Sequence, residues 1–141
     1  MDIILPITSK CNQNCLFCSA KNRKERIGRQ FFQQRINAAK DSLIISGGEP
    51  TLSKHLFWLI DKAKKKNLFI ELQTNGTTLS YEKLAAELVE SGVNLFNINF
   101  PSHLASVNDN ITQTQGLMEK RIGGLENLMN LKASVRLTHV I

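Results

Sequence analysis

The sequence predicts an α/β fold built on parallel strands, and three observations support this prediction. Short apolar runs alternate with longer helical stretches along the chain. This order is typical of parallel strands joined by right-handed helical crossovers. Polar residues recur with a period of two in the later strands, and no linker divides the 141 residues. We therefore expect one domain over residues 1–141, either a parallel partial (β/α) barrel or an open doubly wound sheet.

Five strands are expected, each bounded by turn residues. Pro6 interrupts the first apolar run, Gly47-Gly48 closes the second, and Asn75-Gly76 closes the third. The last run reaches the end of the chain. The expected strands are residues 2–7, 43–45, 68–73, 95–100 and 135–141.

Four helices are expected between these strands, two of them with a core-facing stripe at helical spacing. Ser80 is a candidate N-cap for the third helix, and Gly92 fits its end. Gly123 and Gly124 should weaken or kink the fourth helix. The stripes are Leu56, Leu59, Ile60 and Ala63, then Leu84, Ala85, Leu88 and Val89. The expected helices are residues 31–40, 55–67, 81–91 and 116–131.

One face of the last three strands is polar. The pairs that share this face are Glu71 and Gln73, Asn97 and Asn99, and Arg136 and Thr138. Parallel strands buried on both sides are nearly all apolar. A polar face therefore favours an open or wide barrel that holds a polar ligand. The alternative is that these groups lie at strand ends and are simply solvated.

Composition and charge narrow the class of protein. Apolar residues make up 42% and charged residues 21%, which is ordinary for a globular protein. We expect no membrane span, no secretory signal and a cytoplasmic location. The net charge is +6, but its basic runs are better explained as a loop and a helix end, so we expect no nucleic acid partner. These runs are Lys21, Arg23, Lys24, Arg26 and Arg29, and then Lys62, Lys64, Lys65 and Lys66.

The three cysteines lie within eight residues, directly after the first strand. Cys11, Cys15 and Cys18 form a C-x₃-C-x₂-C run, and thiolates suit iron–sulfur clusters or zinc. A cubane cluster normally takes four cysteines, so three leave one iron open to a substrate. Zinc completed by a histidine is the alternative, although His55, His103 and His139 are not at zinc-finger spacing.

A second motif, Ser46-Gly47-Gly48-Glu49-Pro50-Thr51, ends the second strand. Alone it fits an ordinary strand-to-helix turn. Together with the cysteines, and with Thr8 and Asn12 beside Cys11, it resembles the radical S-adenosylmethionine (radical SAM) enzymes. Three later segments are similar to that family: Gln73-Thr74-Asn75-Gly76, Asn108-Asp109-Asn110-Ile111-Thr112, and the helix from Gly116 to Leu131.

The resemblance implies a partial barrel, two cofactors and a set of roles. The cofactors are a [4Fe–4S] cluster held by the three cysteines and S-adenosylmethionine, whose methionyl group chelates the open iron. Reductive cleavage then yields a 5′-deoxyadenosyl radical that takes hydrogen from a substrate. Phe17 lies near the adenine, and Gly47 and Gly48 bind the methionyl amine through carbonyls. Glu49 binds that amine by its charge. The remaining expected cofactor-binding residues are Pro50, Asn75, Asn99 and Thr138.

The sequence departs from the family in its number of units. We count five strands and four helices of six strand–helix units, and the last strand would be an exposed edge. We therefore expect a fragment of a longer protein, or a partner that completes the site. The substrate, a small molecule or a peptide, stays open, and an electron donor such as flavodoxin or ferredoxin is implied. Two alternatives remain: a zinc- or cluster-binding module that contacts RNA, and a non-catalytic remnant of the fold.

Overall fold

The computed structural model describes residues 2–18 and 27–139 of the 141-residue chain. Five parallel strands form one sheet in the order β1-β2-β3-β4-β5. The strands are β1 (Asp2–Pro6), β2 (Ser42–Ser46), β3 (Phe69–Thr74), β4 (Leu95–Asn99) and β5 (Val135–Thr138). All five predicted strands are confirmed. Residues 140–141 of the last prediction, and residues 21–26 of the first basic run, lie outside the described residues.

Five α-helices and two 3₁₀ helices connect the strands. The α-helices are α1 (Arg29–Ala38), α2 (Leu56–Lys65), α3 (Glu82–Ser91), α4 (Ala105–Thr112) and α5 (Met118–Asn130). The 3₁₀ helices are η1 (Pro50–Leu52) and η2 (Thr77–Ser80). The four expected helices are present, and α4 stands where a loop was expected. No helix in the described part of the chain is long and apolar enough to cross a bilayer.

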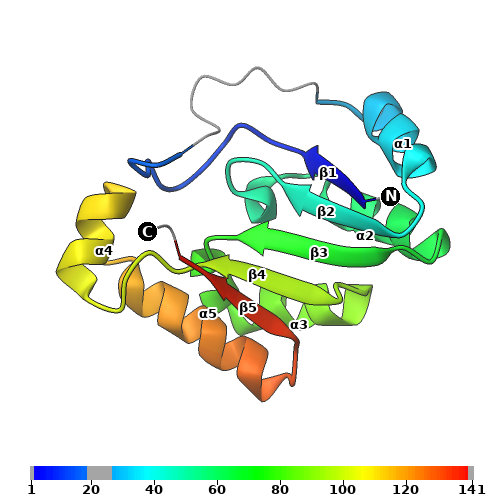
Figure 1. The fold of residues 1–141 in the computed structure, drawn as a ribbon. Helices are drawn as coiled ribbons and strands as arrows, with labels where there is room; N and C mark the ends of the chain where they lie inside the picture. The colour runs from blue at the N-terminus through cyan, green and yellow to red at the C-terminus, as the bar shows by residue number, and fades with distance from the viewer. Residues whose placement is uncertain (1, 19–26, 140–141) are drawn as a thin grey trace.

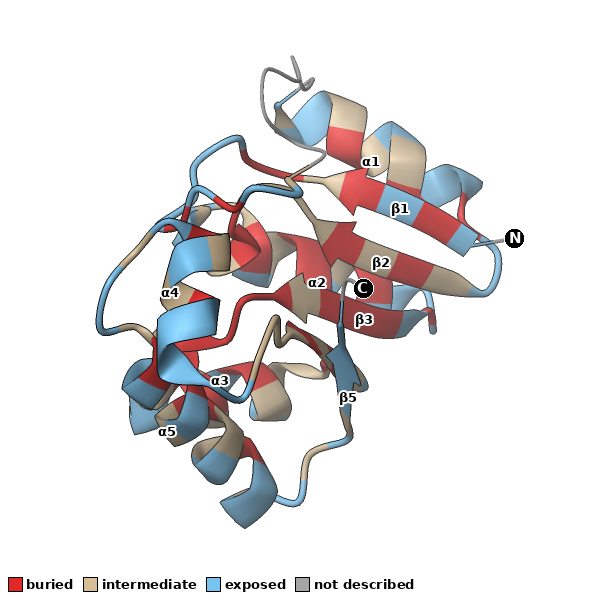
Figure 2. Ribbon diagram, turned by 60° about the vertical axis from the view of Figure 1, so that its left-hand side comes forward, coloured by how far each residue is buried: buried red, intermediate tan, exposed pale blue. Residues whose placement is uncertain are grey.

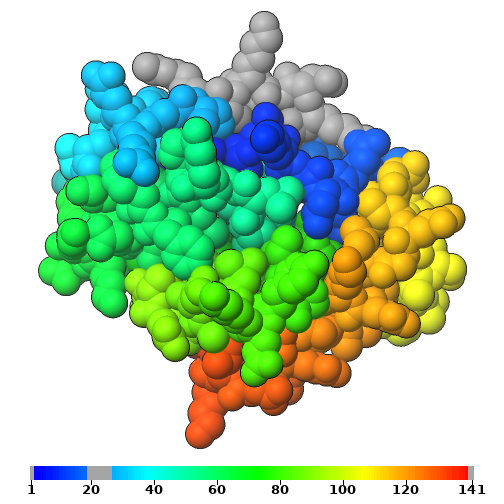
Figure 3. Space-filling view, turned by 180° about the vertical axis from the view of Figure 1, so that it is seen from behind, coloured from blue at the N-terminus to red at the C-terminus, as the bar shows by residue number. Residues whose placement is uncertain are grey.

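The helices α1, α2, α3 and α5 cover one face of the sheet, and the other face is open (Figures 1 and 3). Each strand turns alternate side chains toward the helices, as in Leu43 and Ile45 of β2, which are fully buried. The predicted stripe of α2 is buried in full, and Ala85 and Leu88 are the buried members of the α3 stripe. The open, concave arrangement agrees with the predicted partial barrel (Figure 2).

Two predictions about helix ends have different outcomes. Gly92 ends α3 with a φ of 117°, a left-handed conformation that glycine adopts without a steric cost. Ser80 is not the N-cap of α3, because η2 extends to Ser80 and Tyr81 takes the cap position. The Ser80 hydroxyl instead donates to the carbonyl of Thr77.

Gly124 of the α5 glycine pair has a packing role. The helix runs unbroken through Gly123 and Gly124, so the expected kink is absent. A Cβ atom at Gly124 would collide with the carbonyl oxygen of Gly76 and lie 3.0 Å from the Cβ of Leu79. Gly124 therefore lets α5 approach η2 closely, at the carboxyl end of β3.

The second basic run does more than face water. The Lys66 ammonium donates hydrogen bonds to the carbonyl oxygens of Ile36, Asn37 and Ala39, at 2.9, 2.5 and 2.6 Å. These carbonyls lie at the end of α1, where the helix leaves acceptors unpaired. Lys66 thus caps α1 from the end of α2. Lys65 has the expected solvated role, with an exposed ion pair to Asp61.

Candidate functional site

The carboxyl ends of the five strands point to the same end of the sheet, where the cysteine loop and α4 also lie (Figure 1). Parallel α/β barrels place their sites at this end. A cavity of about 410 Å³ opens there. Its lining combines the cysteine loop with strand ends: Cys11, Gln13, Cys15, Phe17, Cys18, Ser46, Gly47, Gly48, Gln73, Thr74, Asn75, Asn97, Asn99 and Thr138.

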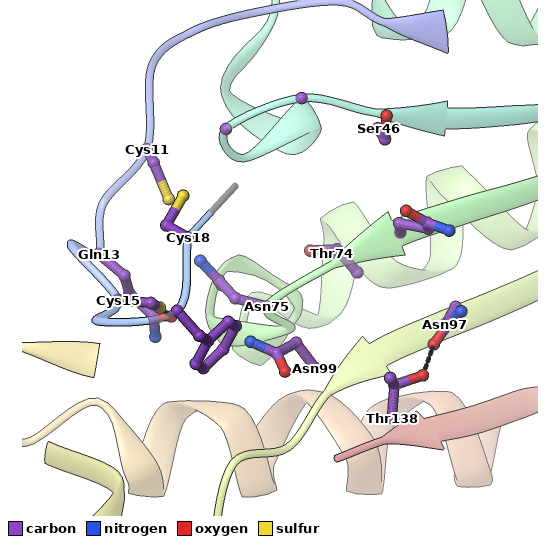
Figure 4. Close-up of a pocket in the computed structure, with 14 residues that line it drawn as sticks. Cys11, Gln13, Cys15, Cys18, Ser46, Thr74, Asn75, Asn97, Asn99 and Thr138 are labelled. Atoms are coloured by element: carbon purple, nitrogen blue, oxygen red, sulfur yellow. Dashed lines mark hydrogen bonds between the residues drawn. The ribbon is translucent and has the colours of Figure 1, made fainter. Parts of the chain in front are cut away.

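All three cysteines line this cavity, with different exposure. Cys11 is exposed, Cys18 is intermediate and Cys15 is buried. Figure 4 shows the sulfurs of Cys11 and Cys18 facing each other and Cys15 at the lower end of the loop. Among the described residues, no group of three or more His, Cys, Asp or Glu side chains could hold a single metal ion. A cubane cluster makes a different demand, because each thiolate binds a different iron.

The cysteine loop is fixed from two sides. On one side, the N–H groups of Asn14 and Leu16 donate to the carbonyls of Thr112 and Ile111 at the end of α4, at 3.0 and 2.9 Å. On the other side, the Asn12 side chain donates to Thr77 at 2.8 Å and accepts from Asn75 at 2.7 Å. The loop conformation therefore depends on residues from the second half of the chain.

The two glycines allow the end of β2 to lie against the start of the cysteine loop. A Cβ atom at Gly47, whose φ is 140°, would lie 2.6 Å from the Thr8 carbonyl oxygen, and one at Gly48 would collide with the Lys10 carbonyl. The Gly48 N–H donates to the Thr8 carbonyl at 2.8 Å. The two glycines predict a close backbone approach, and in the structure this approach is to the backbone of Thr8 and Lys10. Both glycines also line the cavity.

Glu49 lies behind the cavity wall and not on it. Its side chain is completely buried, and its Oε1 accepts from the Thr51 N–H and hydroxyl at 3.2 and 2.6 Å and from the Thr74 hydroxyl at 2.6 Å. Its Oε2 accepts from the Asn75 N–H at 2.8 Å. Burial raises the pKa of this carboxyl, and the hydrogen bonds from Thr51, Thr74 and Asn75 act in the opposite direction. This geometry differs from the expected charge contact with a ligand amine, because the bonds that Glu49 makes are internal.

The other predicted site residues divide into two groups. Phe17, Asn75, Asn99 and Thr138 line the cavity. Pro50 does not line it; this residue is buried at the start of η1, where a proline suits the first position of a helix. Gln13 also lines the cavity, although no sequence pattern singled it out; Ser46 and Thr74 lie within the quoted motifs but were not predicted as site residues.

The polar strand face is a connected network. Asn97 donates to Glu71 at 2.9 Å, and Thr138 donates to Asn97 at 2.5 Å. Arg136 lies 3.7 Å from Glu71, whose side chain is only 11% exposed. The expectation that these residues share one face is confirmed; Glu71 is buried, whereas Arg136 and Thr138 on the edge strand are exposed. The open face of the sheet next to the cavity is thus polar along β3, β4 and β5.

The electrostatics of the cysteines reflect their position in this cavity. Burial is the main cause that raises the pKa of Cys11 and of Cys15. The other cysteines raise the pKa of Cys15 further, while the positive charge of Arg121 lowers it. Arg121 is completely buried on α5; its Nε donates to the Asn75 carbonyl at 2.9 Å, and its Nη1 donates to the Asn108 side chain. No sequence pattern singled out Arg121, because its partners are distant in the chain.

None of the histidines that the zinc alternative requires lines the cavity. His55 precedes α2 and its ring packs edge-on against Phe32, with 5.5 Å between the ring centroids. His139 packs against Phe100. The cavity therefore offers three thiols and no imidazole among its lining residues.

A parallel half-barrel that gathers three cysteines at the carboxyl ends of its strands defines an α/β protein that binds a metallocofactor. The comparisons with known proteins give the family. The Radical SAM superfamily model matches residues 5–141, and the chain belongs to this superfamily. The cofactors predicted from the sequence, a [4Fe–4S] cluster and S-adenosylmethionine, are those that the family uses.

Similar proteins differ in what they make. The chain is 30% identical to a probable GTP 3′,8-cyclase of Methanocaldococcus jannaschii, over 90% of this chain and 45% of the relative. It is 26% identical to Fe-coproporphyrin III synthase of Methanosarcina barkeri, over 96% of this chain and 36% of the relative. The chain thus spans less than half the length of these curated relatives.

Solved structures show the same fold. Native anSMEcpe with bound AdoMet and the Kp18Cys peptide aligns with a TM-score of 0.74 and 22% identity, over 96% of this chain and 42% of that one. Methylornithine synthase aligns with a TM-score of 0.76 and 13% identity, over 96% of this chain and 43% of that one. The predicted partial (β/α) barrel of the radical SAM type is confirmed.

Proposed function

We propose that residues 1–141 form the core domain of a radical SAM enzyme, which binds a [4Fe–4S] cluster and S-adenosylmethionine and cleaves the latter reductively. The observation that carries this proposal is the cavity in which Cys11, Cys15 and Cys18 meet the Gly47-Gly48 turn, in a chain of this superfamily. A reduced cluster supplies the electron for the cleavage, and the resulting 5′-deoxyadenosyl radical abstracts hydrogen from a substrate.

The residues present fit this pair of cofactors. Three thiolates provide soft ligands for three irons, and the wall between them and the strand ends combines the Phe17 ring and glycine backbone with amide and hydroxyl side chains. Gly47 and Gly48 would offer backbone carbonyls to the methionyl amine, and Phe17 an aromatic surface to the adenine. Asn75, Asn99 and Thr138 would hydrogen-bond the ribose or carboxylate. Glu49 would act as a positioning residue, because it fixes Thr74 and Asn75 from behind.

The substrate would lie on the open face of the sheet, beside the cavity. The network of Glu71, Asn97 and Thr138 gives that face fixed hydrogen-bonding groups. The relatives include a GTP 3′,8-cyclase and a PqqA peptide cyclase, so the substrate class is a small molecule or a peptide. The electron would come from a low-potential carrier such as flavodoxin or ferredoxin.

Anaerobic reconstitution tests the proposal. The chain is loaded with iron and sulfide, reduced with dithionite and mixed with S-adenosylmethionine, and 5′-deoxyadenosine is measured. We expect a cluster with four irons per chain and formation of 5′-deoxyadenosine. Cys15→Ala should lose the cluster, whereas Asn99→Leu should keep it and bind S-adenosylmethionine more weakly. Zinc without iron after anaerobic purification, or a loaded cluster that never yields 5′-deoxyadenosine, would contradict the proposal.

A further inference from the structure

Cys15 has surroundings that the other two cysteines lack. It is the buried member of the three, and its Sγ donates a hydrogen bond to the Oε1 of Gln13 at 3.6 Å. Gln13 is itself buried, with 9% of its surface exposed, and lines the cavity. Figure 4 shows Gln13 beside Cys15 at the lower end of the cysteine loop. The hydrogen bond between Cys15 and Gln13 is therefore formed within the cysteine loop itself.

The other end of the Gln13 amide is unsatisfied. Its Nε2 is buried and has no hydrogen-bond partner among the described residues. A buried donor without a partner is energetically unfavourable, so its presence requires an explanation. The feature fits a residue whose partner is present in only one state of the site.

The protonation state of the Cys15 sulfur determines whether the oxygen or the NH₂ group of the Gln13 amide can hydrogen-bond it. A thiol donates to Oε1, as observed. A thiolate that binds iron has no proton, so it accepts and cannot donate. The amide has nearly the same shape in both orientations, and rotation by half a turn presents Nε2–H to the sulfur.

A buried cation lies behind the same sulfur. Arg121 is completely buried, and its Nη2 has no hydrogen-bond partner among the described residues. Its charge lowers the pKa of Cys15, against burial and the neighbouring cysteines, which raise it. Glu49 and Asp109 are the acidic groups that act on Arg121 besides Cys15. Charge in a buried setting acts strongly on its neighbours, so Arg121 partly offsets the burial and the neighbouring thiols that disfavour negative charge on this sulfur.

We propose that Gln13 hydrogen-bonds the cluster-bound sulfur of Cys15, beside the buried cation of Arg121, and thereby raises the reduction potential of the cluster. This inference rests on the proposed function. Hydrogen bonds to the sulfurs and the local charge are among the factors that set cluster potentials. When dithionite gives one electron to the cluster, the added negative charge is spread over the sulfurs, and an N–H donor stabilises that reduced form. Gln13 is thus a positioning and tuning residue.

A redox titration followed by electron paramagnetic resonance tests this inference on the reconstituted chain, without S-adenosylmethionine. The variants are Gln13→Leu, which removes the donor, and Gln13→Glu, which replaces it with an acceptor. At the wild-type midpoint potential, the ratio of reduced to oxidised cluster in Gln13→Leu should be about tenfold lower. For a one-electron couple, this corresponds to a midpoint potential that is lower by about 59 mV. Gln13→Glu should lower the ratio further. Gln34→Leu, an exposed position on α1, should match the wild type.

The outcomes separate this inference from the proposed function. Four irons per chain in Gln13→Leu with an unchanged midpoint would overturn the role of Gln13 and leave the proposed function standing. A purely structural role would lower the iron content without ordering the potentials as Gln, Leu, Glu. If the wild-type chain forms no four-iron cluster, both the proposed function and this inference are wrong.

Discussion

The carboxylate of Glu49 and the backbone N–H of Asn75, 26 residues apart, are joined by a hydrogen bond of 2.8 Å. The bond links the turn after β2 to the turn after β3. The Asn75 carbonyl in turn accepts a hydrogen bond from Arg121, and the Asn75 side chain donates one to Asn12 of the cysteine loop. One buried carboxylate thus holds a residue that hydrogen-bonds both α5 and Asn12 of the cysteine loop.

Glu49→Gln should destabilise the chain. Each oxygen of Glu49 accepts a backbone N–H, from Thr51 at one end and Asn75 at the other. The amide of glutamine therefore places its NH₂ against a fixed donor in either orientation. We expect the free energy of unfolding in urea to fall by about 1–3 kcal/mol. Glu87→Gln on α3 is the control, expected within about 0.5 kcal/mol of the wild type. Unchanged stability with weaker binding of S-adenosylmethionine would instead indicate a direct contact.

The glycine pair of α5 offers a matched comparison. Gly124→Ala should lower stability by about 1–3 kcal/mol, because the new methyl group meets the Gly76 carbonyl and Leu79. Gly123→Ala should raise stability by about 0.5–1 kcal/mol, because its methyl group reaches only Ser80, at 3.6 Å, and alanine is the better helix former. Thermal unfolding of both variants checks the pair. Equal effects would show that α5 does not need the close approach.

Lys66→Met should loosen the end of α1. The change keeps most of the aliphatic stem but removes the ammonium that binds three carbonyls. A loss of about 1 kcal/mol in the free energy of unfolding is expected, together with faster amide exchange at the end of α1. Lys64→Met, at an exposed position of the same helix, should change neither quantity. Similar losses in both variants would argue for a general charge effect.

The Cys11 and Cys15 thiols should become reactive toward alkylating agents at a higher pH than a free cysteine does. Burial raises the pKa of Cys11 and Cys15, so both are mainly protonated near neutral pH. Because iron binds the thiolate, cluster assembly on the apo chain should become more complete as the pH increases from about 7 to about 9. Alkylation of Cys11 and Cys15 by iodoacetamide, mapped by mass spectrometry against pH, measures the midpoints. The unfolded chain in urea serves as the reference, and folded midpoints at or below it would contradict the prediction.

Sequence periodicity was enough to predict the sheet. The strands and the α2 stripe follow from short apolar runs and helical spacing, which depend on neighbouring residues alone. The period-two spacing of Glu71 and Gln73, and of Asn97 and Asn99, also identified the polar face. The cysteine run and the Gly-Gly-Glu-Pro turn placed most of the cavity wall.

Helix α4 shows where this reasoning ends. Its residues include Asn108, Asp109, Asn110 and Thr112, which have low helix propensity and no clear apolar stripe. Tertiary contacts stabilise it: Asn108 is completely buried and accepts from Arg121. The contacts of Glu49 with Thr74 and of Arg121 with Asn108 and Asn75 join residues 13 to 46 positions apart, and local patterns carry no such information.

The clamp on the cysteine loop has a consequence for biosynthesis. The carbonyls that hold Asn14 and Leu16 belong to Ile111 and Thr112, and the arginine behind Cys15 is residue 121. A ribosome delivers the three cysteines about a hundred residues before these groups, at about 5–20 residues per second. The metal-binding segment thus leaves the ribosome seconds before the part of the chain that shapes it. Insertion of an iron–sulfur cluster into the arrangement seen here would therefore have to follow the synthesis of residue 121.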